Sequence, residues 1–239
     1  MGVTGYTTLS RQSGLMREMR VVANNIANAA TTGYRSEGLI FSEFIQSAPG
    51  QESLSMARAN IRNTSLAQGQ LTQTGGDLDL ALEGDGYFMV ETPMGERLTR
   101  SGTFSTNAAG DLVTMDGYRV LDAGRAPMFV PGDAKSVKFG ADGTLSVDGR
   151  ALGQIGIFKP EQTHQMVRED GVMFRVDGEV EAAFETRVLQ GFLEGSNVNA
   201  ISEVARMVEI QRAYEMGQSF LETEDQRVRD AIKKLIKTT

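Results

Sequence analysis

The chain has 239 residues, 40% hydrophobic and 23% charged, so it can form one large or two modest domains and is too apolar to be disordered throughout. Its net charge of -7 argues against a surface that binds nucleic acid or anionic membranes, because such surfaces need clustered Lys and Arg. The absence of cysteine excludes disulfides, thiol catalysis and Cys-ligated zinc.

No apolar run approaches the roughly 20 residues that a membrane-spanning helix needs. The first residues lack the basic and apolar regions of a secretory signal, and Tyr6 stands where a myristoylation signal has Ser or Thr. We therefore expect a cytoplasmic protein, unless a dedicated export apparatus carries it out of the cell.

The first predicted element is a helix over residues 8–30, within an N-terminal segment 1–35. Thr8 and Gln12 are polar positions at the start of its seam, which therefore weakens toward the N-terminus. Gly33 is predicted to end the helix. The apolar seam residues recur at alternating spacings of four and three, as along one face of a helix: Leu15, Met19, Val22, Ile26 and Ala29.

Residues 36–75 are predicted to form an extended connector with little core of its own. Pro49 and Gly50 interrupt this stretch, and residues 51–74 are rich in Ser, Thr, Gln and Asn. Such a composition favours a loop or linker over a packed element.

Residues 76–190 are predicted to form a central antiparallel all-β domain. Asp-Gly pairs, which favour tight hairpin turns, begin at Asp85, Asp116, Asp142, Asp148, Asp170 and Asp177. Short strands separated by regular turn signals are typical of a sandwich or an irregular barrel. The predicted strands are 78–82, 87–91, 97–100, 111–114, 118–121, 135–139, 155–158 and 172–176.

Residues 191–239 are predicted to carry a long C-terminal helix over 199–236. Asn199 is its expected N-cap, and Glu203 lies in the first turn. Gly217 and Glu224 are the two interruptions of a strict three-four repeat. The positions of that repeat are Met207, Ile210, Tyr214, Gly217, Leu221, Glu224, Val228, Ala231 and Leu235.

Two arrangements of these helices are open on periodicity alone. Both helices could pack on the β-domain as ordinary amphipathic helices. The C-terminal helix, however, would be ~55 Å long at about 1.5 Å per residue, whereas a β-domain of this size spans only some 30 Å by radius-of-gyration scaling. Part of the helix must therefore find another partner, either the first helix or other subunits. The predicted fold class is mixed α+β, with a coiled-coil-like assembly domain formed by the two terminal helices.

The catalytic inventory is poor. His164 is the one histidine, and no G-x-S-x-G motif supplies a nucleophile for it, so it is interpreted as a surface loop residue. Glu179 and Glu181 could be posed as a glycosidase pair, yet two residues on one strand provide no cleft. We predict no catalytic, cofactor-binding or metal-binding residue, and therefore no enzyme.

Three further motifs are interpreted as background. Gly84-Asp85-Gly86 resembles the start of a dinucleotide fingerprint but lacks its third glycine, and it is predicted to be a hairpin. Asn63 begins a glycosylation sequon that means little without a secretory signal. The acids Asp77, Asp79, Glu83 and Asp85 lack the spacing of an EF-hand, and we interpret them as the solvated side of a strand.

Three sets of motifs, in order along most of the chain, resemble bacterial flagellar rod and hook proteins. Residues 22–35 (VANNIANAATTGYR) are similar to the N-terminal signature of that family. Residues 191–199 (GFLEGSNVN), followed by Glu203, Met207 and 211–215 (QRAYE), are similar to its C-terminal signature. The motifs similar to the family's β-domain are 78–88 (LDLALEGDGYF), 98–104 (LTRSGTF) and 110–113 (GDLV).

Within this family the chain is most similar to the proximal-rod proteins (FlgF type), with the distal-rod proteins (FlgG type) as the alternative. The resemblance implies a structural subunit of the flagellar basal body, in the drive shaft that transmits torque from motor to hook. The implied partners are proximal and distal rod proteins and copies of the chain itself, with no nucleic acid, small-molecule substrate or cofactor, and without embedding in the membrane. It also implies periplasmic assembly after export by the flagellar type III apparatus, without a cleaved signal peptide.

The signature asparagines have a local rationale. Asn24, Asn25 and Asn28 lie beside the seam of the first helix, where side-chain amides can pair across helices and fix their register. Two other classes of function are kept in view: a non-flagellar coiled-coil dimer with a ligand-binding β-domain, and an enzyme that uses His164.

Overall fold

A computed structural model describes residues 3–46 and 54–237, with side chains over 7–40 and 63–234. The chain forms two compact units. Unit 1 contains residues up to 28, 36–65 and those from 198 onward; unit 2 contains 29–35 and 66–197. Four consecutive segments were expected from the sequence, whereas each unit is assembled from separate parts of the chain.

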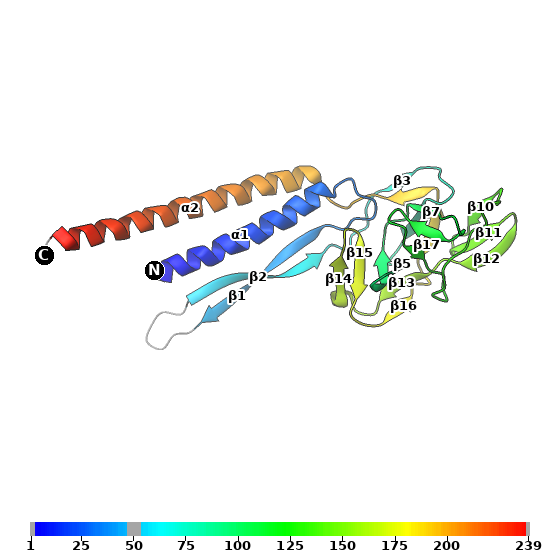
Figure 1. Ribbon diagram of the computed structural model, residues 1–239, viewed down its shortest axis with the longest axis horizontal. Coiled ribbons are helices and arrows are strands. Elements are labelled where there is room, and N and C mark those ends of the chain that lie inside the picture. Colours follow the sequence, from blue (N-terminus) through cyan, green and yellow to red (C-terminus); the bar gives the residue numbers. More distant parts are fainter. Residues whose placement is uncertain (1–2, 47–53, 238–239) are drawn as a thin grey trace. The chain divides into compact units, whose positions relative to one another are not determined.

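Unit 1 contains both helices, α1 (Val3–Ala27) and α2 (Ala200–Lys237), which pack side by side (Figure 1). The backbone N–H of Ser202 donates to the Asn199 side-chain oxygen at 3.1 Å, which confirms the predicted N-cap. Gly33 does not end α1, because the helix stops at Ala27 and Gly33 lies in a separate loop. Neither helix in the described part of the chain combines the length and hydropathy of a membrane-spanning segment.

The segment expected to be an extended connector contains a long β-ribbon. β1 (Glu37–Gln46) and β2 (Leu54–Thr64) pair antiparallel, with an irregularity in register after Ile40, and both strands pack against α1. The polar composition predicted no packed element here, because a strand that is covered on one side needs few apolar residues. Unit 1 is therefore a helix pair with a two-stranded ribbon beside α1 (Figure 1).

Unit 2 is an antiparallel β-structure, as predicted. Its largest sheet has nine strands in the order β14-β15-β6-β5-β9-β8-β7, with β13 pairing to β5 and β16. A three-stranded sheet (β10-β11-β12) and two strand pairs (β4-β17 and β3-β18) complete it. The strands are β3 (Leu71–Gln73), β4 (Leu80–Glu83), β5 (Tyr87–Thr92), β6 (Gly95–Thr99), β7 (Phe104–Thr106), β8 (Leu112–Thr114), β9 (Arg119–Val120), β10 (Val137–Phe139), β11 (Thr144–Val147), β12 (Arg150–Gln154), β13 (Ile157–Pro160), β14 (Met166–Glu169), β15 (Met173–Val176), β16 (Val180–Ala182), β17 (Arg187–Gln190) and β18 (Phe192–Glu194).

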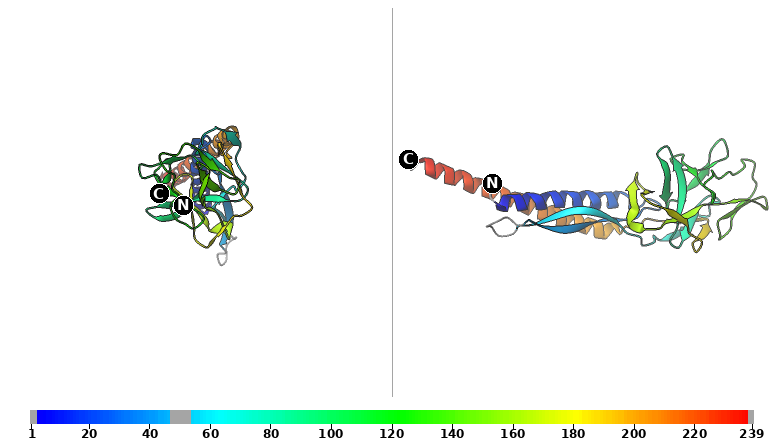
Figure 2. Two further views of the ribbon diagram at one scale, coloured as in Figure 1. Left: turned by 90° about the vertical axis from the view of Figure 1, so that its right-hand side faces the viewer. Right: turned by 90° about the horizontal axis from the view of Figure 1, so that it is seen from below.

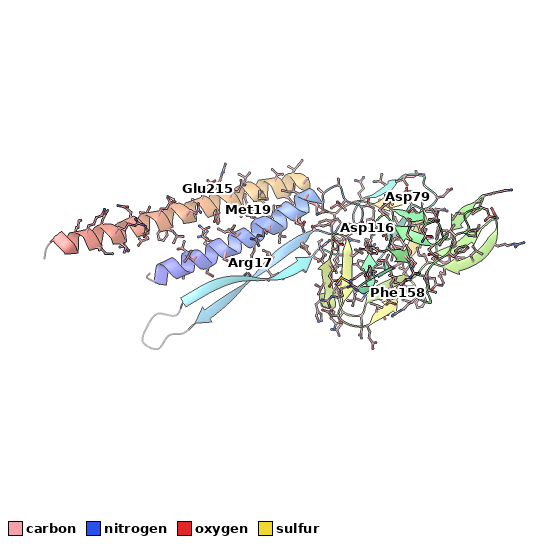
Figure 3. The ribbon with its side chains drawn as sticks, in the orientation of Figure 1. Arg17, Met19, Asp79, Asp116, Phe158 and Glu215 are labelled. Carbon is pink, nitrogen blue, oxygen red and sulfur yellow. The ribbon has the colours of Figure 1, made fainter. Side chains whose placement is uncertain are left out.

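The core of unit 2 lies on both sides of β5. Phe88 and Val90 belong to the larger apolar cluster, while Tyr87 and Met89 belong to a second cluster with Phe158. Because side chains alternate along a strand, this division buries both faces of β5 and explains its unbroken apolar sequence. Figure 3 draws these side chains and labels Phe158, which comes from β13.

The Asp-Gly pairs mark hairpins in four places. Those at Asp116, Asp142, Asp148 and Asp170 join neighbouring antiparallel strands, and Asp148 and Asp170 have positive φ angles of 49° and 41°. The hairpin prediction is wrong for the other two pairs. The pair at Asp85 connects β4 to β5, and the pair at Asp177 connects β15 to β16; neither strand pair is hydrogen-bonded together.

The structure confirms the predicted fold class: the terminal helices pack together and the middle of the chain is antiparallel β-structure. The helices are not part of the compact β-unit. The N-terminal signature is itself divided, because residues up to 28 belong to unit 1 and residues 29–35 to unit 2.

Candidate functional site

The interface between α1 and α2 is the first candidate site. Val22 on α1 and Ile210 on α2 are buried, with 1% and 4% of their surfaces exposed. Met19 is half-buried on α1, whereas Arg17 and Glu215 are exposed (Figure 3). Most other predicted seam positions are half-buried: Leu15, Ile26, Met207, Tyr214, Gly217, Leu221 and Glu224. Heptad periodicity thus located the buried faces of both helices, although Ala29 lies beyond the end of α1.

Gly217, one of the two interruptions of the seam, makes room for Gln12. The Gln12 side-chain N–H donates to the backbone carbonyl of Tyr214 at 2.9 Å. A Cβ atom at Gly217 would stand 2.2 Å from that same amide nitrogen. Gln12, a polar position at the start of the α1 seam, therefore occupies the gap that Gly217 leaves in the α2 seam.

An ion pair and an amide extend this antiparallel pairing. Arg206 places its Nε and Nη2 atoms 3.1 and 2.7 Å from Oε1 of Glu18. Farther along, the Asn25 amide lies 3.3 Å from a carboxylate oxygen of Glu203. The polar contacts thus cross between the helices at several levels, which favours a single register.

The three signature asparagines behave differently from one another. Asn25 is 1% exposed, donates to the backbone carbonyl of Glu37 at 2.8 Å and accepts from its N–H at 2.9 Å. Asn28 instead donates to the backbone carbonyl of Asn24, within the same turn. Pairing across elements is therefore confirmed for Asn25, whereas the contacts of Asn28 with Asn24 are local.

The last part of α2 presents apolar side chains to solvent. Every described side chain from Asp225 to Lys234 is exposed, including Val228 and Ile232 at 51% each. Figure 2 shows that α2 continues past the N-terminal end of α1. Val228 and Ala231 are positions of the predicted seam, so the seam continues where α1 does not cover it.

A buried ionic cluster in unit 2 joins the two signatures. The Glu194 cluster consists of Arg35, Arg100 and Glu194, which are 1%, 3% and 1% exposed. Arg35 Nη2 lies 2.8 Å from Oε1 of Glu194, and Arg100 Nη1 lies 3.1 Å from Oε2. Burial lowers the pKa of Arg35, and Glu194 opposes this shift by stabilising the positive charge.

Gly33 and Tyr34 fit closely beside this cluster. Gly33 has a φ angle of +71°, and a Cβ atom there would come within 2.3 Å of the Ser101 backbone nitrogen. The Tyr34 ring is fully buried and carries the Arg168 guanidinium 4.4 Å from its centroid. The family signature therefore includes a glycine that tolerates no side chain and a tyrosine that is enclosed.

The residues weighed for chemistry do not come together. His164 is exposed in a short 3-10 turn (Thr163–Gln165), and Glu181 pairs with Lys159 at 3.1 Å. Among the acids 77–85, Asp79 accepts a hydrogen bond from Thr74 at 2.6 Å, while the other three acids are exposed. Ala81 on the same strand is buried, so the predicted solvated side is only partly correct. No group of three or more acidic or histidine side chains suited to a metal ion occurs among the residues described.

Sequence reasoning missed the residues that hold the signatures in place. Arg100 bonds to Glu194, which lies 94 residues later in the chain, and Arg168 bonds to Arg35, which lies 133 residues earlier. No local sequence pattern marks Arg100 or Arg168. Arg100 does lie in the quoted motif 98–104, so the resemblance was a signal that could have drawn attention to it.

Comparison with known protein families gives three matches in chain order. The model described as "Flagella basal body rod protein" matches residues 6–35. "Flagellar hook protein FlgE/F/G D1 domain" matches residues 81–147, and "Flagellar basal body rod FlgEFG protein C-terminal" matches 189–233. These ranges include most of α1, much of unit 2 and most of α2.

Individual relatives match over nearly the whole chain. The flagellar basal-body rod protein FlgF of Mesorhizobium japonicum is 36% identical over 233 residues, covering 96% of each chain. FlgF of Caulobacter vibrioides is also 36% identical, over 237 residues and 96% of each chain. FlgG of the same organism is 30% identical over 252 residues, covering 92% of this chain and 94% of its own. The chain therefore belongs to the FlgF family of flagellar basal-body rod proteins, structural subunits that assemble with other rod subunits in the basal body.

Proposed function

We propose that this chain builds the proximal part of the flagellar rod and transmits torque from the motor to the hook. The 36% identity to FlgF of Caulobacter vibrioides, against 30% to FlgG of that organism, favours the proximal over the distal rod. Its partners in this proposal are copies of itself and the neighbouring proximal and distal rod proteins. No nucleic acid, small-molecule substrate or cofactor takes part, and the chain is not embedded in the membrane.

The observation that carries the proposal is the uncovered seam of α2. Val228 and Ile232 lie in the exposed stretch beyond α1, and other apolar side chains on α2 are also open to solvent. Burying a Val or Ile side chain contributes roughly 1.5–3 kcal/mol, so a neighbouring helix is the expected cover for such a surface. The exposed apolar residues of α2 are Ile201, Val204, Val208, Met216, Phe220, Val228 and Ile232.

Rod growth places a constraint on this contact. A shaft elongates by heterologous contacts that repeat along a helical path, since a closed ring would stop growth. A helix whose covered and uncovered seams share one register can contact its own chain with one part and the next subunit with the other.

The proposal includes export by the flagellar type III apparatus without a cleaved signal peptide. Assembly of the rod lies beyond the cytoplasmic membrane, and the family relationship supports this route. Unit 1 holds α1 and α2 together by partly exposed polar contacts such as Glu18 with Arg206, which are 15% and 42% exposed. Contacts of this kind are individually weak, so breaking them adds little to the free energy needed to unfold the chain for passage.

The test introduces a carboxylate on the uncovered seam. In cells that lack the native gene, Val228→Asp is expected to weaken subunit association by about tenfold or more, because it removes roughly 1.5–3 kcal/mol of apolar burial. Motility and the number of complete basal bodies should fall, with unit 2 still folded in the purified chain. Gln226→Asp, also an exposed position in this stretch, is the matched control and should assemble normally. Equal assembly of both variants would contradict the proposal.

A further inference from the structure

The chain passes between its two units four times, and unit 2 ties three of these passages together. The passages follow Asn28, Arg35, Ser65 and Asn197. Each is a single stretch of backbone, which by itself leaves rotation about φ and ψ free. How stiffly unit 2 holds the ends of these stretches therefore matters for any load that passes along the chain.

Arg35 joins the second and third passages directly. Its Nη1 atom donates to the backbone carbonyl of Leu66 at 3.0 Å and also to that of Ala67. Leu66 is the first residue of unit 2 after the ribbon. One planar guanidinium group thus fixes the direction of the chain on both sides of the β1–β2 ribbon, within unit 2.

Glu194 and Asn197 bring in the fourth passage. Asn197 donates from its backbone to Tyr34 O at 3.2 Å and from its side chain to Ala67 O at 2.7 Å. Glu194 accepts from the Gly69 N–H at 3.0 Å as well as from Arg35, and its own carbonyl accepts from the Gly33 N–H at 2.7 Å. The second and third passages are therefore bonded to the Glu194 carboxylate through Arg35 and Gly69, and the fourth is bonded to both of them through Asn197.

Arg100 connects this meeting point to the core of unit 2. Besides Glu194, it donates to the Leu82 carbonyl at 3.4 Å and to the Gly84 carbonyl, at the end of β4. Its guanidinium also lies 4.9 Å from the centre of the Tyr87 ring. The Glu194 cluster is consequently not an isolated ion pair, because one of its cations is bonded to a strand of the buried core.

We propose that Glu194 is a positioning residue of the rod subunit: it holds together the ends, within unit 2, of three chain passages, so that load entering unit 2 along the chain reaches its core without local twisting of these ends. This inference rests on the proposed function as a torque-bearing subunit. An apolar cluster of equal size could repack under load, whereas the two guanidinium groups bind their oxygen acceptors in fixed directions. Breaking a buried pair by removing one charge leaves its partner uncompensated, so this role depends on the Glu194 charge.

The test compares Glu194→Gln, which keeps the shape and loses the charge, with Glu185→Gln at an exposed position of the same unit. In the purified chain, tryptic cleavage after Arg35 should be faster in Glu194→Gln by roughly tenfold, the factor expected from losing one hydrogen bond to a charged group. In cells, counted complete basal bodies should match the parent, while swimming speed should fall more steeply than the parent's as medium viscosity rises.

The outcomes test the role of Glu194 separately from the proposed function in the rod. A residue that only stabilised unit 2 would lower the number of basal bodies and leave the viscosity dependence of the assembled ones unchanged. That result, or unchanged cleavage after Arg35, overturns the inference. If Glu194→Gln does not fold, Arg100→Lys keeps a cation beside Glu194 and loses the forked bonds to the Leu82 and Gly84 carbonyls. It should then show the same two effects, and their absence is again contradictory. Absence of the parent chain from basal bodies would instead refute the proposed function. The cleavage result would still show whether Glu194 holds the chain near Arg35 in place.

Discussion

The side chain of Gln12 in α1 reaches across to α2 and donates to the backbone carbonyl of Tyr214 at 2.9 Å, in a space that exists only because residue 217 is glycine. Its amide oxygen is buried without a hydrogen-bond partner among the described residues. The contact thus joins a favourable bond to an unfavourable buried acceptor. The Gln12 contact therefore does more to fix how α1 and α2 align along their lengths than to stabilise the helix pair.

This arrangement predicts strong coupling between Gly217 and Gln12. Gly217→Ala raises helix propensity by about 1 kcal/mol but displaces the Gln12 amide, which loses a bond that contributes roughly 0.5–1.5 kcal/mol. The substitution alone should therefore be nearly neutral. In a Gln12→Ala background it should stabilise the helices by about 1 kcal/mol. Urea unfolding followed by circular dichroism at the helix band measures both. Equal effects in the two backgrounds would show that the contact does not couple the helices.

Asn25 and Asn24 form a matched pair in the signature. Asn25→Ala leaves the N–H and the carbonyl of Glu37 without their side-chain partner in a buried place, which costs roughly 1–3 kcal/mol. Asn24 is exposed, and its substitution by Ala should stay within about 0.5 kcal/mol. Thermal unfolding of the two variants distinguishes them. A similar change in both variants would mean that the buried bonds between Asn25 and Glu37 contribute little to stability.

The burial of Tyr87 predicts that unit 2 loses stability at alkaline pH. Burial raises the pKa of its hydroxyl, outweighing the attraction of Arg100 and Arg35 for the phenolate. The unfolded chain then loses this proton first, from about pH 10 upward. The contribution of Tyr87 is complete below that pH and is lost as the pH rises through the folded-state pKa, by at most about 1.4 kcal/mol per pH unit.

The measurement is denaturant unfolding between neutral pH and pH 11. Tyr87→Phe should flatten the alkaline fall in stability, whatever it does at neutral pH. An identical slope in the parent and Tyr87→Phe would assign the alkaline loss to other groups.

The elements that could be predicted from the sequence are those marked by a local pattern of residues. The α2 seam was predictable because a heptad pattern repeats from Met207 onward, and the Asn199 cap is a local bond. β5 was predictable because both of its faces are buried, which leaves an apolar run. Strands such as β3 and β18 were missed, since three residues with mixed burial carry no periodicity.

Contacts between distant residues could not be predicted in this way. The β1–β2 ribbon depends on pairing and on the cover that α1 provides, and neither is visible in a polar composition. The role of Gly217 becomes clear only once Gln12, far away in the sequence, lies against it. Arg35 and Glu194 both fall in quoted signatures, yet their pairing required the fold.

The hydrogen bond from the Asn197 side chain to the Ala67 carbonyl has an evolutionary consequence. It brings the beginning and the end of the chain segment 66–197 to within one bond of each other, at 2.7 Å. A segment with adjacent ends can be lengthened, shortened or exchanged at little entropic cost to the rest of the chain. Chains that differ widely in the size of this segment can therefore have diverged from one ancestor while keeping the same pair of terminal helices.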